Sequence, residues 1–127
     1  MNTYRNIELE VIRWAEGRRI IPRSTPAAQA TKTLEEAGEL LQAATALKVI
    51  DDIGKMLGPT GQDLLTEYRN TWRDQFIDGA GDVVVTLVNA CALADVDLID
   101  CFAAAYEQIK DRTGTLGEDG VFRKDQP

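Results

Sequence analysis

Apolar side chains recur at helical spacing along most of the chain. In residues 4–18 they follow a period of about 3.6 residues, and Gly17 closes the segment. The spacing predicts a helix over residues 4–18. The apolar positions of this helix are Ile7, Val11, Ile12, Trp14 and Ala15.

Two further helices are predicted on either side of a break in the pattern. The first runs from Pro26 to about Leu47 with Thr25 as its N-cap, because proline in the first helical position loses no hydrogen bond. The second runs from about Asp74 to Ala94. Residues 48–75 contain GPTG, which interrupts a helical pattern, while LLTEYRNTW has the composition of another short helix, so they are interpreted as a variable excursion.

A fourth helix is expected after Asp97, its predicted N-cap, and it ends near Arg112 with Gly114 as the stop. In the tail, GEDG predicts a turn that joins two short strands. The expected fold class is all-α, a four-helix-bundle-type domain with a short irregular or hairpin tail. A chain of 127 residues fits one domain, residues 1–127.

The predicted helix over 26–47 carries acids on a side that also holds alanines. At the helical repeat, Lys32, Glu35, Glu36 and Glu39 share one side, and Leu34 and Leu41 lie on the opposite side. A solvated charged face is the commoner interpretation of such a string. Both sides of this helix nevertheless suit contact with other helices.

Asp82 favours a second interpretation. Residues 80–94 are apolar or small nearly all round, which is typical of a buried helix. A buried, unpaired carboxylate is costly, so Asp82 is expected to be protonated, paired with a cation or bound to metal. Asp78, one turn earlier, and Asn89, two turns later, lie on the same stripe, which has no Lys or Arg.

If the two acidic faces meet, their carboxylates need a multivalent cation. Two carboxylates about 5 Å apart repel by roughly 3 kcal/mol at an effective dielectric constant near 20. All-oxygen ligands select a hard ion, so Mg²⁺ is expected, with Mn²⁺ as a substitute. Magnesium usually keeps waters or substrate phosphates in its shell, which predicts a metal–polyphosphate substrate. Three glycines adjoin the acids, namely Gly38, Gly79 and Gly81, and each is unfavourable inside a helix. They indicate a close helix crossing, which ordinary helix–helix packing explains as well as a metal site does.

Composition excludes several classes of function. The chain has no histidine, which excludes imidazole chemistry, and its net charge of −7 argues against sequence-independent nucleic-acid binding. Cys91 and Cys101 lack CxxC spacing and are expected to be small buried hydrophobes. No apolar run approaches the length of about 20 residues that spans a bilayer, and MNTYRNIELE lacks signal-peptide features, so no membrane contact and a cytoplasmic location are expected.

Two strings, EEAGE at residues 35–39 and DGAGD at 78–82, resemble the acidic motifs EExxE and ExxD of a known family. This family is the all-α nucleoside triphosphate pyrophosphohydrolases, and within it the chain looks like a small MazG-like protein. The first acid of ExxD falls on Gly79, and Asp78 stands one residue earlier on the same face. The similarity also covers WAEGRRIIPRSTPAAQ, AAAYEQIKDRTGTL and DGVFRK, and therefore most of the chain except residues 48–75.

The resemblance implies Mg²⁺-dependent hydrolysis of a nucleoside triphosphate between the α and β phosphates, giving a monophosphate and pyrophosphate. It implies Glu36, Glu39 and Asp82 as metal ligands, with Asp78 binding directly or through water. Glu35 is a ligand or the base that orients water, so Glu35 and Glu36 are the predicted catalytic residues.

Four polar residues are candidate substrate contacts. Lys110 and Arg112, in IKDR, match the motif for phosphate contacts, although cations at a helix carboxyl end also complement the helix dipole. Lys32 contacts substrate or forms an ordinary pair on the helix face. Asn89 bonds a sugar hydroxyl, a metal ligand or a neighbouring backbone group.

Similar proteins are dimers or tetramers, so a homodimer or homotetramer is expected, with a nucleoside triphosphate as substrate. Two alternatives stay open. One is a pyrophosphatase of the same superfamily specific for dUTP or phosphoribosyl-ATP, and the other is a non-catalytic helical oligomerisation module. Residues 48–75 would be a lid, a specificity element or a lengthened connection.

Overall fold

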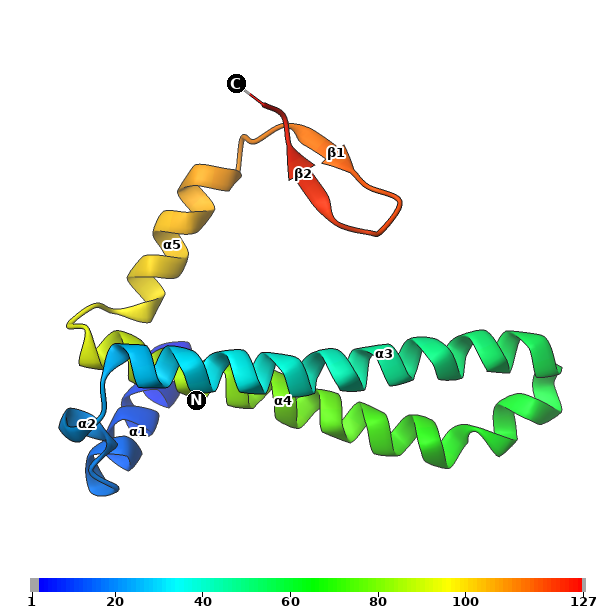
Figure 1. Ribbon diagram of the computed structural model, residues 1–127, viewed down its shortest axis with the longest axis horizontal. Helices are drawn as coiled ribbons and strands as arrows, with labels where there is room; N and C mark the ends of the chain where they lie inside the picture. Colours follow the sequence, from blue (N-terminus) through cyan, green and yellow to red (C-terminus); the bar gives the residue numbers. More distant parts are fainter. Residues whose placement is uncertain (1–2, 127) are drawn as a thin grey trace.

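The chain folds as a mostly helical protein with a two-stranded tail (Figure 1). The computed structural model describes residues 3–126. This arrangement confirms the predicted all-α class and the hairpin in the tail. The elements in order are α1 (Tyr4–Gly17), α2 (Ile20–Arg23), α3 (Pro26–Leu64), α4 (Thr66–Leu93), α5 (Leu98–Ile109), β1 (Gly114–Leu116) and β2 (Phe122–Lys124).

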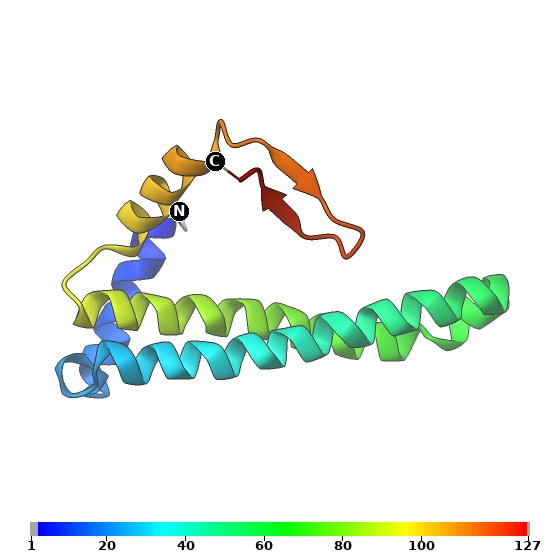
Figure 2. The same ribbon diagram turned by 45° about the horizontal axis from the view of Figure 1, so that its top comes forward.

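The body of the molecule is a long antiparallel hairpin of α3 and α4, which lie side by side (Figures 1 and 2). Near one end of this hairpin, α1 and α2 pack against α4. Both predicted caps are confirmed. The Thr25 side chain accepts a 3.0 Å hydrogen bond from the Ala28 N–H, and the Asp97 side chain accepts one of 3.3 Å from the Ile99 N–H.

Residues 48–75, interpreted as a variable excursion, are nearly all helical, and the break predicted at GPTG is present at Gly58. Gly58 takes a positive φ of 72°, which suits glycine, and Pro59 follows it, so the chain bends at this point and α3 continues to Leu64. Arg69 on α4 then holds the two helices together, since it donates a 3.0 Å hydrogen bond to Gln62 and lies 3.6 Å from an Asp51 oxygen. The excursion is therefore a regular extension of the α3–α4 hairpin.

The carboxyl-terminal arm, residues 98–126, consists of α5 and the β1–β2 hairpin. The arm leaves the body after Asp95, which has a positive φ of 56°, and it extends away from α3 and α4 (Figures 1 and 2). In the hairpin, Gly114 pairs with Lys124 and Leu116 pairs with Phe122. Helix α5 ends at Ile109, a few residues before the predicted end near Arg112.

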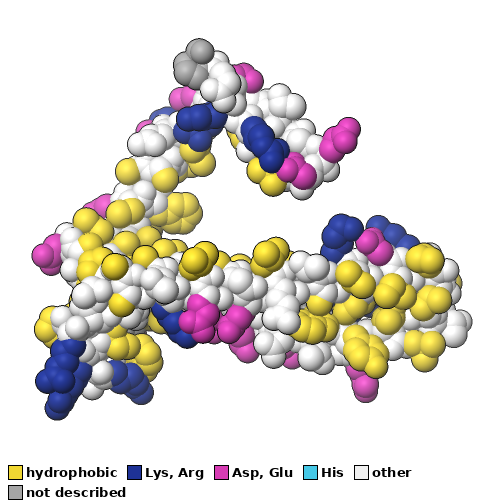
Figure 3. Space-filling model, in the orientation of Figure 1, with side chains coloured by type: hydrophobic (Ala, Val, Ile, Leu, Met, Phe, Trp, Pro, Cys, Tyr) yellow, Lys and Arg dark blue, Asp and Glu magenta, His cyan; other side chains and the backbone are white. Residues whose placement is uncertain are grey.

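The core of a single chain is small. In the described part of the chain, the buried hydrophobic residues are Ala15, Ala43, Ile50 and Val88, and no large side chain is fully buried. Many hydrophobic side chains instead lie on the surface (Figure 3). Since α5 contacts α4 but extends away from α3, the described residues do not form the predicted four-helix bundle within one chain.

The prediction of a helix buried nearly all round over residues 80–94 is wrong for this single chain. Asp82 is exposed and Val84 is 43% exposed, although α1, α2, α3 and α5 all contact α4. Helix α4 is long and apolar enough to cross a membrane by length and composition, a test that core helices of soluble proteins also pass. The two cysteines are free, and Cys101 is exposed, so the expectation that both are buried is also wrong.

Candidate functional site

The acid-bearing side of α3 is the side that packs toward α4. Glu36 is 8% exposed and Ala43 is fully buried, whereas Leu34, on the opposite side of the helix, is 75% exposed. The hydroxyls of Thr33 on α3 and Thr86 on α4 lie 2.7 Å apart and form a hydrogen bond across this contact. The acids of residues 35–39 therefore lie beside the helix that carries Asp78 and Asp82.

Gly79 marks the close crossing of the two helices. A Cβ atom at position 79 would lie 3.3 Å from the Cα of Leu40, which is tighter than ordinary van der Waals contact. Gly38 and Gly81 have open space around the equivalent position. Of the three glycines expected at a close crossing, the structure places one there.

Acids from both helices line one cavity of about 360 Å³, here named the acidic cavity. Glu39 comes from α3, and Asp78 and Asp82 come from α4. The motif ExxD would place its first acid at position 79, where this chain has Gly79. A side chain at this position would crowd the Leu40 backbone, whereas Asp78 lines the acidic cavity. The other residues that line it are Gln42, Trp72, Gln75 and Gly79.

A second cavity, of about 520 Å³, adjoins the acidic cavity through Asp82, which lines both. We name it the Trp14 cavity. Its polar lining includes Lys32, Glu36 and Asn89, and its aromatic and apolar lining includes Trp14 and Val85. The remaining lining residues are Ile20, Ala28, Gln29 and Thr86.

Electrostatic repulsion within the cluster is visible at Glu36 and Glu39. A hydrogen bond that the protonated Glu39 carboxyl donates to Glu36, followed by the negative charge of Glu36, raises the pKa of Glu39 above its ordinary value. Lys32 compensates part of this charge, since its Nζ lies 3.2 Å from a Glu35 oxygen and 3.4 Å from Glu36 Oε1. Glu36 Oε2 is buried and has no hydrogen-bond partner.

The donor chemistry of this cluster fits a hard divalent cation. Among residues 3–126, no group of three or more His, Cys, Asp or Glu side chains stands ready to hold a metal ion. Carboxylates from two helices nevertheless line one cavity, and the unpartnered Glu36 oxygen lies beside it. A Mg²⁺ ion that also takes water or phosphate oxygens, as magnesium usually does, needs only one or two carboxylates.

Asn89 is the most deeply buried polar residue of the site, with 2% exposure. Its Oδ1 atom has no hydrogen-bond partner, and the residue lines the Trp14 cavity. An unpaired buried acceptor costs free energy unless it gains a donor. This arrangement favours a ligand donor over the interpretation that Asn89 satisfies a neighbouring backbone group.

The predicted phosphate contacts of the arm do not meet the acids within one chain. Lys110 forms a 2.7 Å ion pair with Glu107 on α5, and Arg112 lies in the turn that follows the helix. The carboxyl end of α5 lies away from α3 and α4 in both views (Figures 1 and 2). Glu35, 60% exposed and paired with Lys32, lies at the edge of the cluster.

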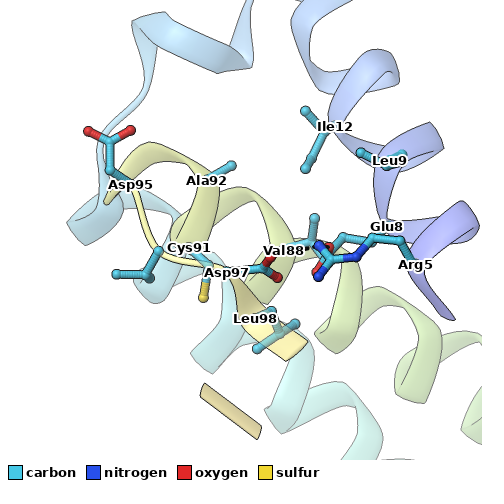
Figure 4. Close-up of a pocket in the computed structure, with 11 residues that line it drawn as sticks. Arg5, Glu8, Leu9, Ile12, Val88, Cys91, Ala92, Asp95, Asp97 and Leu98 are labelled. Atoms are coloured by element: carbon cyan, nitrogen blue, oxygen red, sulfur yellow. Dashed lines mark hydrogen bonds and ion pairs between the residues drawn. The ribbon is translucent and has the colours of Figure 1, made fainter. Parts of the chain in front are cut away.

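The sequence interpretation missed a polar network where α1 meets the start of α5 (Figure 4). Arg5 donates hydrogen bonds of 2.6 Å to Glu8 and 2.7 Å to Asp97, and these residues line a cavity of about 310 Å³. Burial, followed by the charge of Glu8, raises the pKa of Tyr4 to about 12. Glu8 is 4% exposed, and its position one turn before Val11 and Ile12 is the sequence signal for its burial.

Comparisons with models of protein families, with curated proteins and with solved structures find no match to this chain. The interpretation of the site therefore depends on its residues and geometry, together with the motif resemblance.

Proposed function

We propose that this chain hydrolyses nucleoside triphosphates, or their deoxy forms, between the α and β phosphates to give a nucleoside monophosphate and pyrophosphate. One observation carries the proposal. Glu39 of α3 and Asp78 and Asp82 of α4 line a single cavity, beside the buried Glu36. The resemblance of EEAGE and DGAGD to the pyrophosphohydrolase motifs supports the same chemistry.

Glu36, Glu39, Asp78 and Asp82 would hold Mg²⁺, or Mn²⁺ in its place. When bound, the cation would neutralise phosphate charge and lower the pKa of a water that attacks phosphorus. The carboxylates give this region a negative charge, which by itself would repel a polyphosphate anion. A bound cation would offset this charge and so explain how an acidic protein binds such a substrate.

The side chains of the site have complementary tasks in this proposal. Glu35 and Glu36 accept or orient the proton of the attacking water. Lys32, beside both catalytic carboxylates, is positioned to contact phosphate oxygens. The Trp14 cavity has the volume of a small-molecule site, and Asn89 Oδ1 would accept a hydrogen bond from the sugar or base.

Lys110 and Arg112 remain proposed phosphate contacts. Because the end of α5 lies away from the acidic cavity, they would reach it from another copy or after a movement of the arm. A bundle completed by more than one copy, as a homodimer or homotetramer in the cytoplasm, is part of the proposal.

The experiment is incubation of the purified protein with a panel of nucleoside triphosphates, deoxynucleoside triphosphates and phosphoribosyl-ATP in the presence of Mg²⁺. Monophosphate and pyrophosphate are the expected products, and Asp82→Asn should lower their rate of formation at least about 100-fold. Turnover of dUTP alone, or of phosphoribosyl-ATP alone, would identify the narrower pyrophosphatase. Release of orthophosphate alone, or no turnover of any nucleotide, would contradict the proposal.

A further inference from the structure

Two cysteines lie on either side of the connection between the body and the arm. Cys91 is in the last turn of α4, and Cys101 is in the first turn of α5. The connection turns back at Asp95, which has a positive φ of 56°, and the Val96 N–H donates a 2.9 Å hydrogen bond to the Cys91 carbonyl oxygen. The start of α5 is therefore held beside the last turn of α4.

Helical spacing directs both thiols to the contact between these two helices. Val84, Leu87 and Cys91 lie at positions i, i+3 and i+7 of α4, so they share one side of this helix. Val84 and Leu87 line a cavity of about 410 Å³ together with Cys101 of α5. Leu98, one turn before Cys101, lines the cavity of about 310 Å³ together with Cys91 (Figure 4). The side of α4 that carries Cys91 is thus the side that meets Cys101.

The two thiols differ in their access to solvent. Cys101 is exposed, whereas Cys91 is half-buried, and both are free. Burial, followed by the charge of the Cys101 thiolate and a hydrogen bond that protonated Cys91 donates to it, raises the pKa of Cys91. Because the thiolate is the nucleophile, Cys101 meets a dissolved reagent first and Cys91 reacts afterwards.

We propose that Cys91 and Cys101 form a reversible disulfide bond by exchange with a low-molecular-weight disulfide such as oxidised glutathione. The Cys101 thiolate attacks one sulfur of the reagent, which breaks the S–S bond of the reagent, forms a mixed disulfide and releases one thiolate. The Cys91 thiolate then attacks the Cys101 sulfur, forms the bond between the two cysteines and releases the second thiolate. The two cysteine protons end on the released thiols, so the reagent is reduced to two thiols as the protein dithiol is oxidised.

The bond would change the attachment of the arm and leave the proposed catalytic site untouched. Neither cysteine lines the acidic cavity or the Trp14 cavity. A covalent link from α4 to the first turn of α5 restricts the directions in which the arm leaves the body. Disulfides of cytosolic proteins are usually transient and redox-sensing, and a reversible bond is compatible with the proposed cytoplasmic location. This bond does not depend on nucleotide hydrolysis.

The first experiment equilibrates the whole protein with a series of ratios of oxidised to reduced glutathione under argon, and then blocks the remaining thiols with an alkylating reagent. The mass of the intact protein should show loss of both free thiols, in a product of one chain that carries no glutathione. Trypsin has no site between the cysteines, whereas cleavage before Asp95, Asp97 and Asp100 separates them. The two fragments of this second digest should stay joined until they are reduced. Alkylation of both thiols, glutathione on both, or disulfides only between chains, at every ratio, would overturn the proposal.

The second experiment separates this geometry from the mere closeness of two cysteines along the chain. The matched control combines Cys91→Ala with Ala90→Cys, which turns the thiol about 100° around α4, away from Cys101. The folded wild type should need at least about 10-fold less oxidised glutathione than this variant, since thiols joined only by a flexible segment have an effective concentration in the millimolar range. In urea the two proteins should behave alike. Equal disulfide formation by the two folded proteins would overturn the proposal.

Single variants test the order of the two exchange steps. Cys91→Ala should stop at a mixed disulfide on Cys101. Cys101→Ala should form its mixed disulfide more slowly, because its remaining thiol is half-buried and has a raised pKa. Faster modification of Cys101→Ala than of Cys91→Ala would overturn the assignment of Cys101 as the first nucleophile.

Discussion

Gly79 of α4 lies so close to the backbone of Leu40 of α3 that a Cβ atom at position 79 would lie 3.3 Å from the Leu40 Cα. The residues next to this contact are Asp78 and Glu39, which line the acidic cavity from opposite helices. The close crossing therefore sets the separation of the carboxylates that we propose as metal ligands.

We expect Gly79→Val to lower the free energy of unfolding by about 1–3 kcal/mol, because its branched side chain must push the Leu40 backbone away. The measurement is urea unfolding followed by circular dichroism. Gly81→Ala is the matched control on the same helix, since a Cβ there meets open space. It should raise the free energy of unfolding by roughly 0.5–1 kcal/mol through helix propensity. Equal effects of the two substitutions would contradict a close crossing at residue 79.

Mg²⁺ or Mn²⁺ should raise the melting temperature of the wild-type protein, because a ligand that binds only the folded state stabilises it. Glu36→Gln, Glu39→Gln and Asp82→Asn should each remove most of this rise. The control is Asp63→Asn, at an exposed carboxylate near the end of α3 and outside both cavities, which should leave the rise unchanged. A wild-type protein whose melting temperature does not respond to either ion would contradict the proposed metal site.

The raised pKa of Glu39 predicts how stability depends on pH without divalent ions. Its hydrogen bond with Glu36 makes the folded state bind a proton more tightly than the unfolded state does. This stabilisation is present below the ordinary glutamate pKa and is lost as the pH rises through the raised value. Thermal melts in chelator from pH 4 upward should show this loss, and Glu39→Gln should reduce it. A variant with the same pH profile as the wild type would show that Glu39 and Glu36 do not share a proton.

Much of the fold follows from local signals in the sequence. Thr25 and Asp97 cap their helices as predicted, and GEDG forms the predicted connection between two strands. These positions depend on short-range chemistry, namely a side-chain oxygen beside free N–H groups or a tight turn. Helical spacing also places Glu39 on the side of α3 where it lines one cavity with Asp78 and Asp82.

The remaining features depend on contacts that local patterns do not contain. At Gly58 the regular helix is interrupted, as GPTG predicts, but Pro59 begins a further helical stretch and Arg69 ties α3 to α4, a contact that the local pattern does not contain. From the composition of its helix, Asp82 was predicted to be the buried acid. In the structure Asp82 is exposed, and the buried acid is Glu36, on the side of α3 that meets α4 near Gly79. Val84 and Phe102 are 43% and 66% exposed, because an apolar composition does not show which faces of a helix its neighbours cover.

Tyr4 should titrate unusually late among the three tyrosines. Burial and the nearby Glu8 raise the pKa of Tyr4 to about 12, compared with about 10 for a free phenol. The resulting stabilisation is complete below about pH 10 and is lost as the pH rises through about 12. The ultraviolet absorbance of tyrosinate measures this step, which Tyr4→Phe should remove and Tyr68→Phe should retain. If Tyr4→Phe leaves the late step in place, the contact of Tyr4 with Glu8 is not formed in solution.

Asp97 combines two tasks, because it caps α5 and pairs with Arg5 of α1. Asp97→Ala should lower the free energy of unfolding by about 1 kcal/mol through loss of the cap. Asp97→Asn keeps a capping oxygen and loses only the charge, so it should cost less than Asp97→Ala. Arg5→Met removes the same ion pair from the other side and also takes the cation from the buried Glu8, so it should cost more than Asp97→Asn.

Hydrogen exchange of the backbone amides distinguishes the cap from the ion pair. The first turn of α5 should lose protection in Asp97→Ala, since the Ile99 N–H no longer has its partner. In Arg5→Met the cap remains, so this turn should stay protected while the contact between α1 and α5 loosens. Equal loss of protection in both variants would mean that Arg5 and the cap hold α5 as one unit, and the ion pair would then be essential for the position of the whole arm.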